Sequence, residues 1–266
     1  MNESIITPAQ RLAIARHPQR PGTADFIAAL CTDFFEQRGD RLCREDPSIL
    51  GGIALFHGRP VTVLGHRKGR TLAENLRYNF GMPGPEGYRK ALRIMKQAEK
   101  FRRPIFTFID TPGAYPGVEA EARGQGEAIA ENLAAMSSLT VPVICVVTGE
   151  GCSGGALAIG VGNTVLMLEN AVYSVLSPEG FASILWKDAG RAGEACAVMK
   201  LTAADLLAQK VIDGILREPP GGAHTDPARM FRILDRALVR QLEALDKYSG
   251  PALAAARYKK FRAMGN

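Results

Sequence analysis

The amino-acid sequence predicts a single α/β domain built on a mostly parallel sheet. The chain has 266 residues, which is enough for one domain with a sizeable core. Its composition, 46% hydrophobic and 23% charged, is that of an ordinary globular protein. From residue 105 onwards, short apolar runs alternate with amphipathic segments, a pattern typical of parallel strands joined by helices. No internal repeat or low-complexity linker divides the chain.

The first hundred residues predict four elements. Residues 1–24 are expected to form an extended or irregular lead-in, because prolines at three positions oppose a long helix. Residues 25–36 carry apolar side chains at helical spacing. Residues 52–65 form two β-rich runs around a His-Gly turn, which predicts a hairpin. After a Gly/Pro cluster, residues 88–98 place Tyr, Leu, Met and Ala on one face of an amphipathic helix.

The remaining elements follow from the period of the apolar residues. The expected strands are residues 105–109, 141–147, 164–168 and 172–176. The expected helices are residues 121–136, 202–209, 227–245 and 251–264, with a short helical turn at 157–160.

Composition disfavours several classes of protein. The longest apolar run, Val141–Val147, is too short to cross a bilayer, and no basic-then-apolar leader is present, so we expect a cytoplasmic protein. The five cysteines are scattered and form no C-x-x-C pair, so neither a disulfide framework nor a metal site is expected. The net charge of +6 suits an anionic partner, which could be a phosphorylated cofactor, an acidic protein or a nucleic acid.

Two short motifs suggest nucleotide chemistry, but neither has the context it needs. Asp110–Gly113 matches an Asp-x-x-Gly turn of nucleotide hydrolases, yet no G-x-x-x-x-G-K-[ST] phosphate cradle precedes it. Gly149–Gly154 matches the dinucleotide fingerprint G-x-G-x-x-G. The segment after it contains Gly160 and Gly162, which are poor material for the long helix of such a site.

The glycine-rich segment Gly151–Gly155 supports a different interpretation. It lies where an apolar strand ends and a helix is expected to begin. Glycines allow a substrate to approach the backbone, and the first N–H groups of a helix have no partner within it. Such N–H groups can form an oxyanion hole, which stabilises an oxygen that becomes negative during a reaction. A tight structural turn remains the alternative interpretation of these residues.

Long stretches along residues 11–262 resemble bacterial acetyl-CoA carboxylase carboxyltransferase α subunits in both order and spacing. The matching segments are Gly51–Ala54, Gly65–Arg70, Asn79–Ala91, Phe108–Gly117, Arg123–Gly126, Gly149–Gly160, Tyr173–Gly180, Ser183–Lys187 and Gly221–His224. The resemblance implies a crotonase-like fold of ββα units with peripheral helices, and a carboxyltransferase domain over residues 25–266.

The resemblance also implies a function. Chains of this family transfer the carboxyl group from carboxybiotin on a carrier protein to acetyl-CoA, forming malonyl-CoA in the first committed step of fatty acid biosynthesis. They are active only with a β subunit, in an α2β2 assembly that works with the biotin carboxyl carrier protein and with the ATP-binding biotin carboxylase. Zinc is expected only on the β partner and no metal on this chain. Membrane association is not expected, and nucleic-acid binding is not favoured.

The family motif carries particular roles onto this sequence. The backbone N–H groups of Gly154 and Gly155 would stabilise the ureido oxygen of biotin and are the expected catalytic groups. The loop that contains Lys68 and Gly69 is where such folds place a second oxygen-binding donor. Further residues expected at the substrate or biotin are Gly113, Ala114, Tyr115, Gly117 and Ser153, although shaping of the turn alone is an alternative for the segment 113–117.

This sequence departs from the family pattern in two respects. Cys152 stands where the family usually has Gly, so the backbone there is expected to avoid the angles that only glycine adopts. The family's long N-terminal helical hairpin is missing or very short. Three other hypotheses stay open: a specialised-pathway paralogue, a stand-alone crotonase-like hydratase, isomerase or decarboxylase, and a non-catalytic protein that binds nucleic acid through the basic segment Arg257–Arg262.

Overall fold

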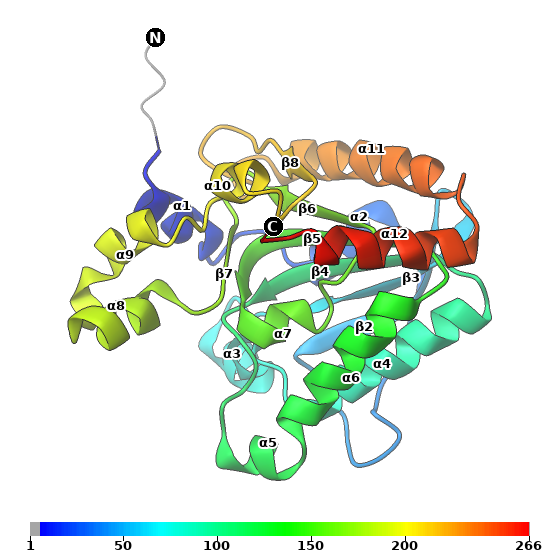
Figure 1. Ribbon diagram of the computed structural model, residues 1–266, viewed down its shortest axis with the longest axis horizontal. Coiled ribbons are helices and arrows are strands. Elements are labelled where there is room, and N and C mark those ends of the chain that lie inside the picture. Colours follow the sequence, from blue (N-terminus) through cyan, green and yellow to red (C-terminus); the bar gives the residue numbers. More distant parts are fainter. Residues whose placement is uncertain (1–5, 266) are drawn as a thin grey trace.

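The computed structural model describes residues 6–265 and shows a mixed sheet with helices on both faces (Figure 1). The eight strands of this range follow the order β1-β2-β3-β4-β5-β6-β8, and β7 pairs with β5 off that path. The pairs β1–β2 and β2–β3 are antiparallel, and every later pair is parallel. The strands are β1 (Thr32–Glu36), β2 (Ile49–Phe56), β3 (Arg59–His66), β4 (Ile105–Thr111), β5 (Val143–Cys152), β6 (Thr164–Leu168), β7 (Val172–Ser174) and β8 (Gly214–Leu216).

Strand β5 is the centre of the sheet and is buried along all ten of its residues. Its first half pairs with β6, from Ile144 to Val147, and its last three residues pair with β7. The pairing of β4 with β5 loses regular register between Ile109 and Thr111. A β-bulge of this kind redirects a side chain at the end of a strand, and here the residue at the irregularity is Asp110.

Helices cover the sheet in two layers. The helices α4 (Pro85–Lys100), α6 (Gln125–Ser138) and α12 (Gly250–Arg262) pack on one another and against one face (Figure 1). The helices α2 (Thr23–Leu30) and α11 (Pro227–Leu245) cover the other face. The apolar faces of α4 and α11 explain this arrangement, because Ile94, Met95, Leu234 and Leu238 are fully buried against the strands.

A helical arm extends from the body at the left of Figure 1. It contains α8 (Pro178–Trp186), the short helix η2 (Ala189–Arg191) and α9 (Ala192–Val198), which pack on one another. Helix α9 also packs on α1 (Pro8–Ala15), so α1 joins the arm to the domain. The remaining helices are α3 (Leu72–Arg77), η1 (Asn79–Gly81), α5 (Val118–Ala122), α7 (Ser153–Leu157) and α10 (Ala203–Ala208).

The predicted hairpin, the helix that contains residues 88–98 and the helix over 227–245 are confirmed, as is the largely parallel sheet. The prediction of an irregular lead-in is wrong, because α1 begins at Pro8. Proline at the first helical position loses no hydrogen bond, and Thr7 closes the helix start with a capping box that includes Gln10. The described part of residues 1–24 therefore contains helix, and the separation of a lead-in from a domain over 25–266 stays a prediction.

Three expected helix boundaries are also wrong. Residues 25–36 are not one helix, because the chain leaves α2 after Leu30 and pairs as strand β1 with the edge of β2. Residues 121–136 contain two helices, since Gly124 has a left-handed conformation (φ 84°) that interrupts them. The helical turn expected at 157–160 starts earlier, with α7 at Ser153. Helices α3, α8 and α9, and strand β8, were not predicted.

Candidate active site

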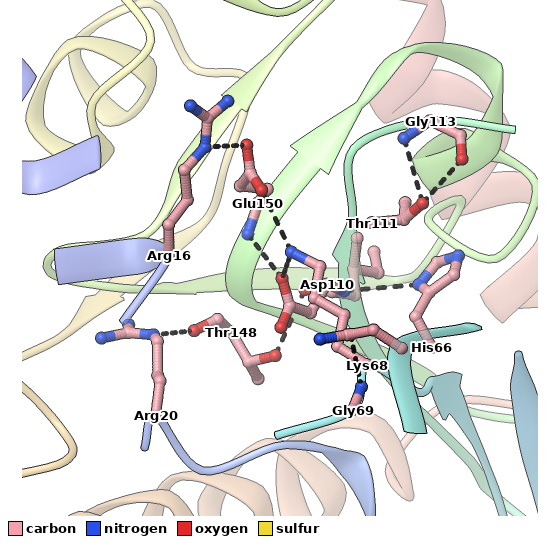
Figure 2. Close-up of polar contacts among 12 residues, drawn as sticks. Arg16, Arg20, His66, Lys68, Gly69, Asp110, Thr111, Gly113, Thr148 and Glu150 are labelled. Carbon is pink, nitrogen blue, oxygen red and sulfur yellow. Dashed lines mark hydrogen bonds and ion pairs between the residues drawn. The ribbon is translucent and has the colours of Figure 1, made fainter. Parts of the chain in front are cut away.

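Polar residues gather where β3, β4 and β5 end and α7 begins (Figure 2). Adjacent parallel strands place their carboxyl ends at one edge of a sheet, where ligands of α/β proteins bind. His66 closes β3, Asp110 lies next to the end of β4, and Glu150 lies near the end of β5. That these three residues lie together was not predicted from the sequence.

Asp110 contacts residues at the ends of both neighbouring strands. Its Oδ1 accepts the backbone N–H of Glu150 at 2.9 Å and lies 2.7 Å from Nζ of Lys68. Gly149 makes this possible, because a Cβ at that position would lie 2.3 Å from the same oxygen. The carboxylate is therefore engaged by protein groups, which does not fit the magnesium-binding role that the Asp-x-x-Gly motif suggested.

A chain of ion pairs runs from Lys68 to the helical arm. Lys68 Nζ is 3.0 Å from Oε2 of Glu150, and Nε of Arg16 is 2.8 Å from the other oxygen of that carboxylate (Figure 2). Arg16 also pairs with Glu179 at the start of α8, with 2.5 Å between Nη1 of Arg16 and Oε1 of Glu179. Burial by itself would lower the pKa of Lys68, but the charges of Asp110 and Glu150 outweigh it and raise that pKa. The two carboxylates therefore favour the protonated form of Lys68, which does not suit a general base.

His66 is the fully buried histidine of this edge. Its Nδ1 accepts the backbone N–H of Asp110 at 3.3 Å, which places the ring proton on Nε2. Burial lowers the pKa of His66 to about 3, so the ring is neutral. A backbone interaction with Gly155 opposes part of this shift, so the ring contacts the turn between β5 and α7.

In the glycine turn between β5 and α7, position 152 avoids the backbone angles that only glycine adopts, as predicted from the cysteine at this position. Cys152 is extended (φ −127°, ψ 129°), a conformation open to any residue. The left-handed residue is Ser153 (φ 57°), whose side chain is exposed. Such a conformation in a non-glycine residue costs about 1–3 kcal/mol and is common at functional turns. The dinucleotide interpretation is wrong here, since Gly149–Cys152 continues β5 and α7 has only five residues.

Gly155 has no room for a side chain. A Cβ there would lie 2.4 Å from the nitrogen of Ala114 and 2.7 Å from the carbonyl carbon of Gly113. At Gly154 the nearest atom would be Cγ2 of Ile129, at 3.4 Å. The Thr111 hydroxyl fixes Gly113 on the other side of this contact. It accepts the N–H of Gly113 at 3.0 Å and donates to the Gly113 carbonyl at 2.8 Å.

A cavity of about 570 Å³ opens beside the ion pairs. Lys68, Gly69, Asp110, Pro112 and Glu150 form one wall, and α1, α2 and the segment around Tyr78 and Phe80 complete it. Of the predicted site residues, Lys68 and Gly69 line this cavity. The other predicted residues are not among those that line it, so the predicted site residues do not all face this one cavity.

The remaining predicted residues have structural contacts of their own. The N–H of Gly69 donates to Oδ1 of Asn75 at 2.9 Å, so this amide is occupied within the chain. The N–H of Tyr115 donates to the carbonyl of Pro83 at 3.0 Å, and the ring of Tyr115 leaves no room for a Cβ at Gly117. Gly117 is the residue before α5.

Sequence reasoning missed the arginines that bring the first helix to the site. Arg20 donates to the carbonyl of Thr148 at 2.6 Å and forms a buried pair with Glu218 at 2.6 Å. Together with the Arg16–Glu150 pair, this fixes the residues after α1 against β5. The sequence did carry one signal for the acidic residues of the site, since Asp110 and Glu150 each follow a predicted apolar strand.

The basic segment 257–262 is not a free cationic surface. Arg257 is buried, and its guanidinium donates to the carbonyls of Met136 and Leu139 at 2.7 and 2.9 Å. Lys260 pairs with Asp213 at 2.8 Å. Two of the cations on which the nucleic-acid hypothesis rested are therefore engaged within the chain. No helix in the described residues is long and apolar enough to span a membrane.

Comparison with solved structures defines the class as the carboxyltransferase fold, which confirms the predicted crotonase-like architecture. A transcarboxylase 12S core superposes with a TM-score of 0.69 at 20% identity, over 93% of this chain and 46% of that one. A Pseudomonas malonate decarboxylase hetero-tetramer gives 0.64 at 18% identity, over 79% of this chain and 83% of that one. The present chain thus spans less than half the length of the transcarboxylase chain.

Sequence comparison then identifies the family. The family model described as acetyl co-enzyme A carboxylase carboxyltransferase-like matches residues 3–265, and the chain belongs to this family. An acetyl-coenzyme A carboxylase carboxyl transferase subunit alpha from Geobacillus kaustophilus is 59% identical over 260 residues, which is 98% of this chain and 80% of the relative. The subunit of the same name from Bacillus velezensis is 56% identical over the same length. The protein is therefore of the α-subunit type and a carboxyl-transferring enzyme.

Proposed function

We propose that this chain is the α half of a cytoplasmic acetyl-CoA carboxylase carboxyltransferase. In this proposal it pairs with a zinc-bearing β subunit as α2β2. The complex takes the carboxyl group from carboxybiotin on the carrier protein, which biotin carboxylase has loaded, and passes it to acetyl-CoA to form malonyl-CoA. The family match over residues 3–265 supports the reaction class, and the packing of Gly155 supports the site.

The residues at α7 fit an oxygen that becomes negative. The first N–H groups of a helix lack partners within the helix, and they carry the positive end of its dipole. Gly154 and Gly155 occupy this position, and Gly155 brings the backbone against the Gly113–Ala114 peptide without an intervening side chain. When bound, carboxybiotin supplies an activated carboxyl group whose departure leaves negative charge on the ureido oxygen.

The chain's own contribution is to hold that oxygen with backbone dipoles. The N–H groups of Gly154 and Gly155 are the donors we assign to it, and loss of one such donor costs about 10²–10³ in rate in other enzymes. Because the N–H of Gly69 is engaged by Asn75, we propose that Lys68 and Gly69 form the cavity wall instead of a second donor pair. The 113–117 turn and Ser153 flank the glycine turn and shape the approach to it.

The test compares the activity of the chain alone with its activity in the presence of the β subunit. The chain is purified alone and together with the β subunit of its own host, and carboxyl transfer between malonyl-CoA and biocytin is followed. Activity is expected only for the pair. Turnover of acyl-CoA substrates by the isolated chain would support the stand-alone hydratase, isomerase or decarboxylase instead, and an inactive pair with a properly associated β subunit would contradict the proposal.

A further inference from the structure

Tyr88 has a buried hydroxyl that lacks a partner. Its side chain comes from α4, is fully inaccessible to solvent and packs in a small cluster with Ala128 and Ala158, with Ala114 and Ile129 at its edge. Within residues 6–265 no group accepts from or donates to its hydroxyl. Burial raises the pKa of Tyr88 well above its usual value, so the hydroxyl keeps its proton.

This hydroxyl lies at the glycine turn. The position that a Cβ of Gly155 would take is 3.0 Å from the hydroxyl oxygen of Tyr88 and 2.4 Å from the nitrogen of Ala114. Tyr88 and the Gly113–Ala114 peptide therefore bound the same small space, into which the backbone of Gly155 fits. We call this space the Gly155 slot.

Stability alone does not explain a tyrosine at this place. Burying a hydroxyl without a hydrogen bond is unfavourable, whereas phenylalanine would fill the same apolar cluster at no such cost. Native proteins retain features of this kind where function requires them.

We propose that Tyr88 is a positioning residue for the carboxyl transfer, whose hydroxyl sets the separation between the first turn of α7 and the Gly113–Ala114 peptide. This inference rests on the proposed function of the chain. Without the hydroxyl, the slot gains the volume of one oxygen atom, and the backbone of Gly155 relaxes into it. A displacement on the order of 1 Å in a catalytic group can cost about 10²-fold in rate.

The variant Tyr88→Phe tests the proposal in the complex of this chain with its β subunit. We expect kcat to fall by about tenfold to a hundredfold, with the KM values for biocytin and malonyl-CoA within about twofold of the wild type. The Tm of the isolated chain should stay equal or rise, because an unsatisfied hydroxyl has been removed. The matched control is Tyr248→Phe, an exposed tyrosine in the turn after α11, for which none of these quantities should change.

A second measurement does not depend on activity. Amide hydrogen exchange in residues 153–157 should be faster in Tyr88→Phe than in the wild type, while exchange in the sheet core is unchanged. An unchanged kcat, or a kcat that falls only in proportion to a lower Tm, would overturn the positioning role. If the wild-type pair transfers no carboxyl group, the proposed function fails, and the exchange measurement alone decides whether Tyr88 holds the turn.

Discussion

The backbone of Gly155 packs directly on the peptide that joins Gly113 to Ala114. A Cβ at position 155 would approach the Ala114 nitrogen to 2.4 Å, a distance that real side chains do not tolerate. The contact joins the end of β4 to the start of α7, two segments that are some forty residues apart in the sequence. The position of the candidate oxygen-binding N–H groups therefore depends on the 113–114 turn as much as on their own helix.

Replacement of Gly155 by alanine should impair both the turn and the reaction. The new methyl group must displace Ala114 or α7, so we expect carboxyl transfer to fall by about 10²-fold or more. Gly126→Ala in α6 is the control, because a Cβ at that position would meet no atom within 4 Å. Steady-state rates of both variants with the β subunit provide the check, and similar losses in the two would contradict the special role of Gly155.

Removal of the Lys68 cation should destabilise the site through the carboxylates that it leaves behind. Lys68→Met leaves Asp110 without its cation, at a side-chain exposure of 13%. Breaking one partner of a buried pair costs about 3–5 kcal/mol. The double variant Lys68→Met/Asp110→Asn should recover part of this loss, because the uncompensated charge is gone. Urea unfolding of the wild type, Lys68→Met, Asp110→Asn and the double variant gives the coupling energy, and strictly additive losses would refute it.

His66 should make the stability of the protein depend on pH. Its folded pKa of about 3 lies below the ordinary value of 6.5, so the unfolded chain binds more protons between these values. Stability from this residue is therefore complete above pH 6.5 and is lost as the pH falls towards 3. Between pH 7.5 and 5.5 the loss is about 1.4 kcal/mol.

The comparison with His66→Asn isolates this contribution. An asparagine oxygen can still accept the N–H of Asp110, but it does not titrate. The free energy of unfolding of the variant, measured at both pH values, should change by about 1.4 kcal/mol less than that of the wild type. Identical pH dependence in the two proteins would mean that the pKa of His66 is the same in the folded and unfolded states.

Arg257 should stabilise the fold by pairing the buried carbonyls at the end of α6. Its guanidinium donates to the carbonyls of Met136 and Leu139 and to that of Val141 at 3.2 Å. Arg257→Met would leave these buried acceptors unpaired, at a cost of about 3 kcal/mol or more in unfolding free energy. Arg257→Lys keeps the charge but not the planar fork, and should lose nearly as much. Calorimetry measures both, and an unchanged Tm in either variant would argue against this role.

Several features were predictable because they depend on residues close together in the sequence. The amphipathic helices over 85–100 and 227–245 bury one face of a strong 3.6-residue pattern, and the hairpin of β2 and β3 follows from a local turn. The extended backbone at Cys152 also followed from local reasoning, since a non-glycine residue there disfavours a left-handed conformation. Strand β1 was mistaken for helix, because pairing with β2 overrode an apolar spacing that suits a helix.

The sequence by itself determined the α/β order, the family and the glycine turn at the end of a buried strand. Only the tertiary structure decided that Gly155 has no room for a side chain, and that Asp110 reaches both Lys68 and Glu150. Asp110 and Glu150 meet at the irregular register between β4 and β5, which brings together residues forty positions apart. Periodicity describes which face of an element is buried, but the register of its neighbours sets which side chains meet.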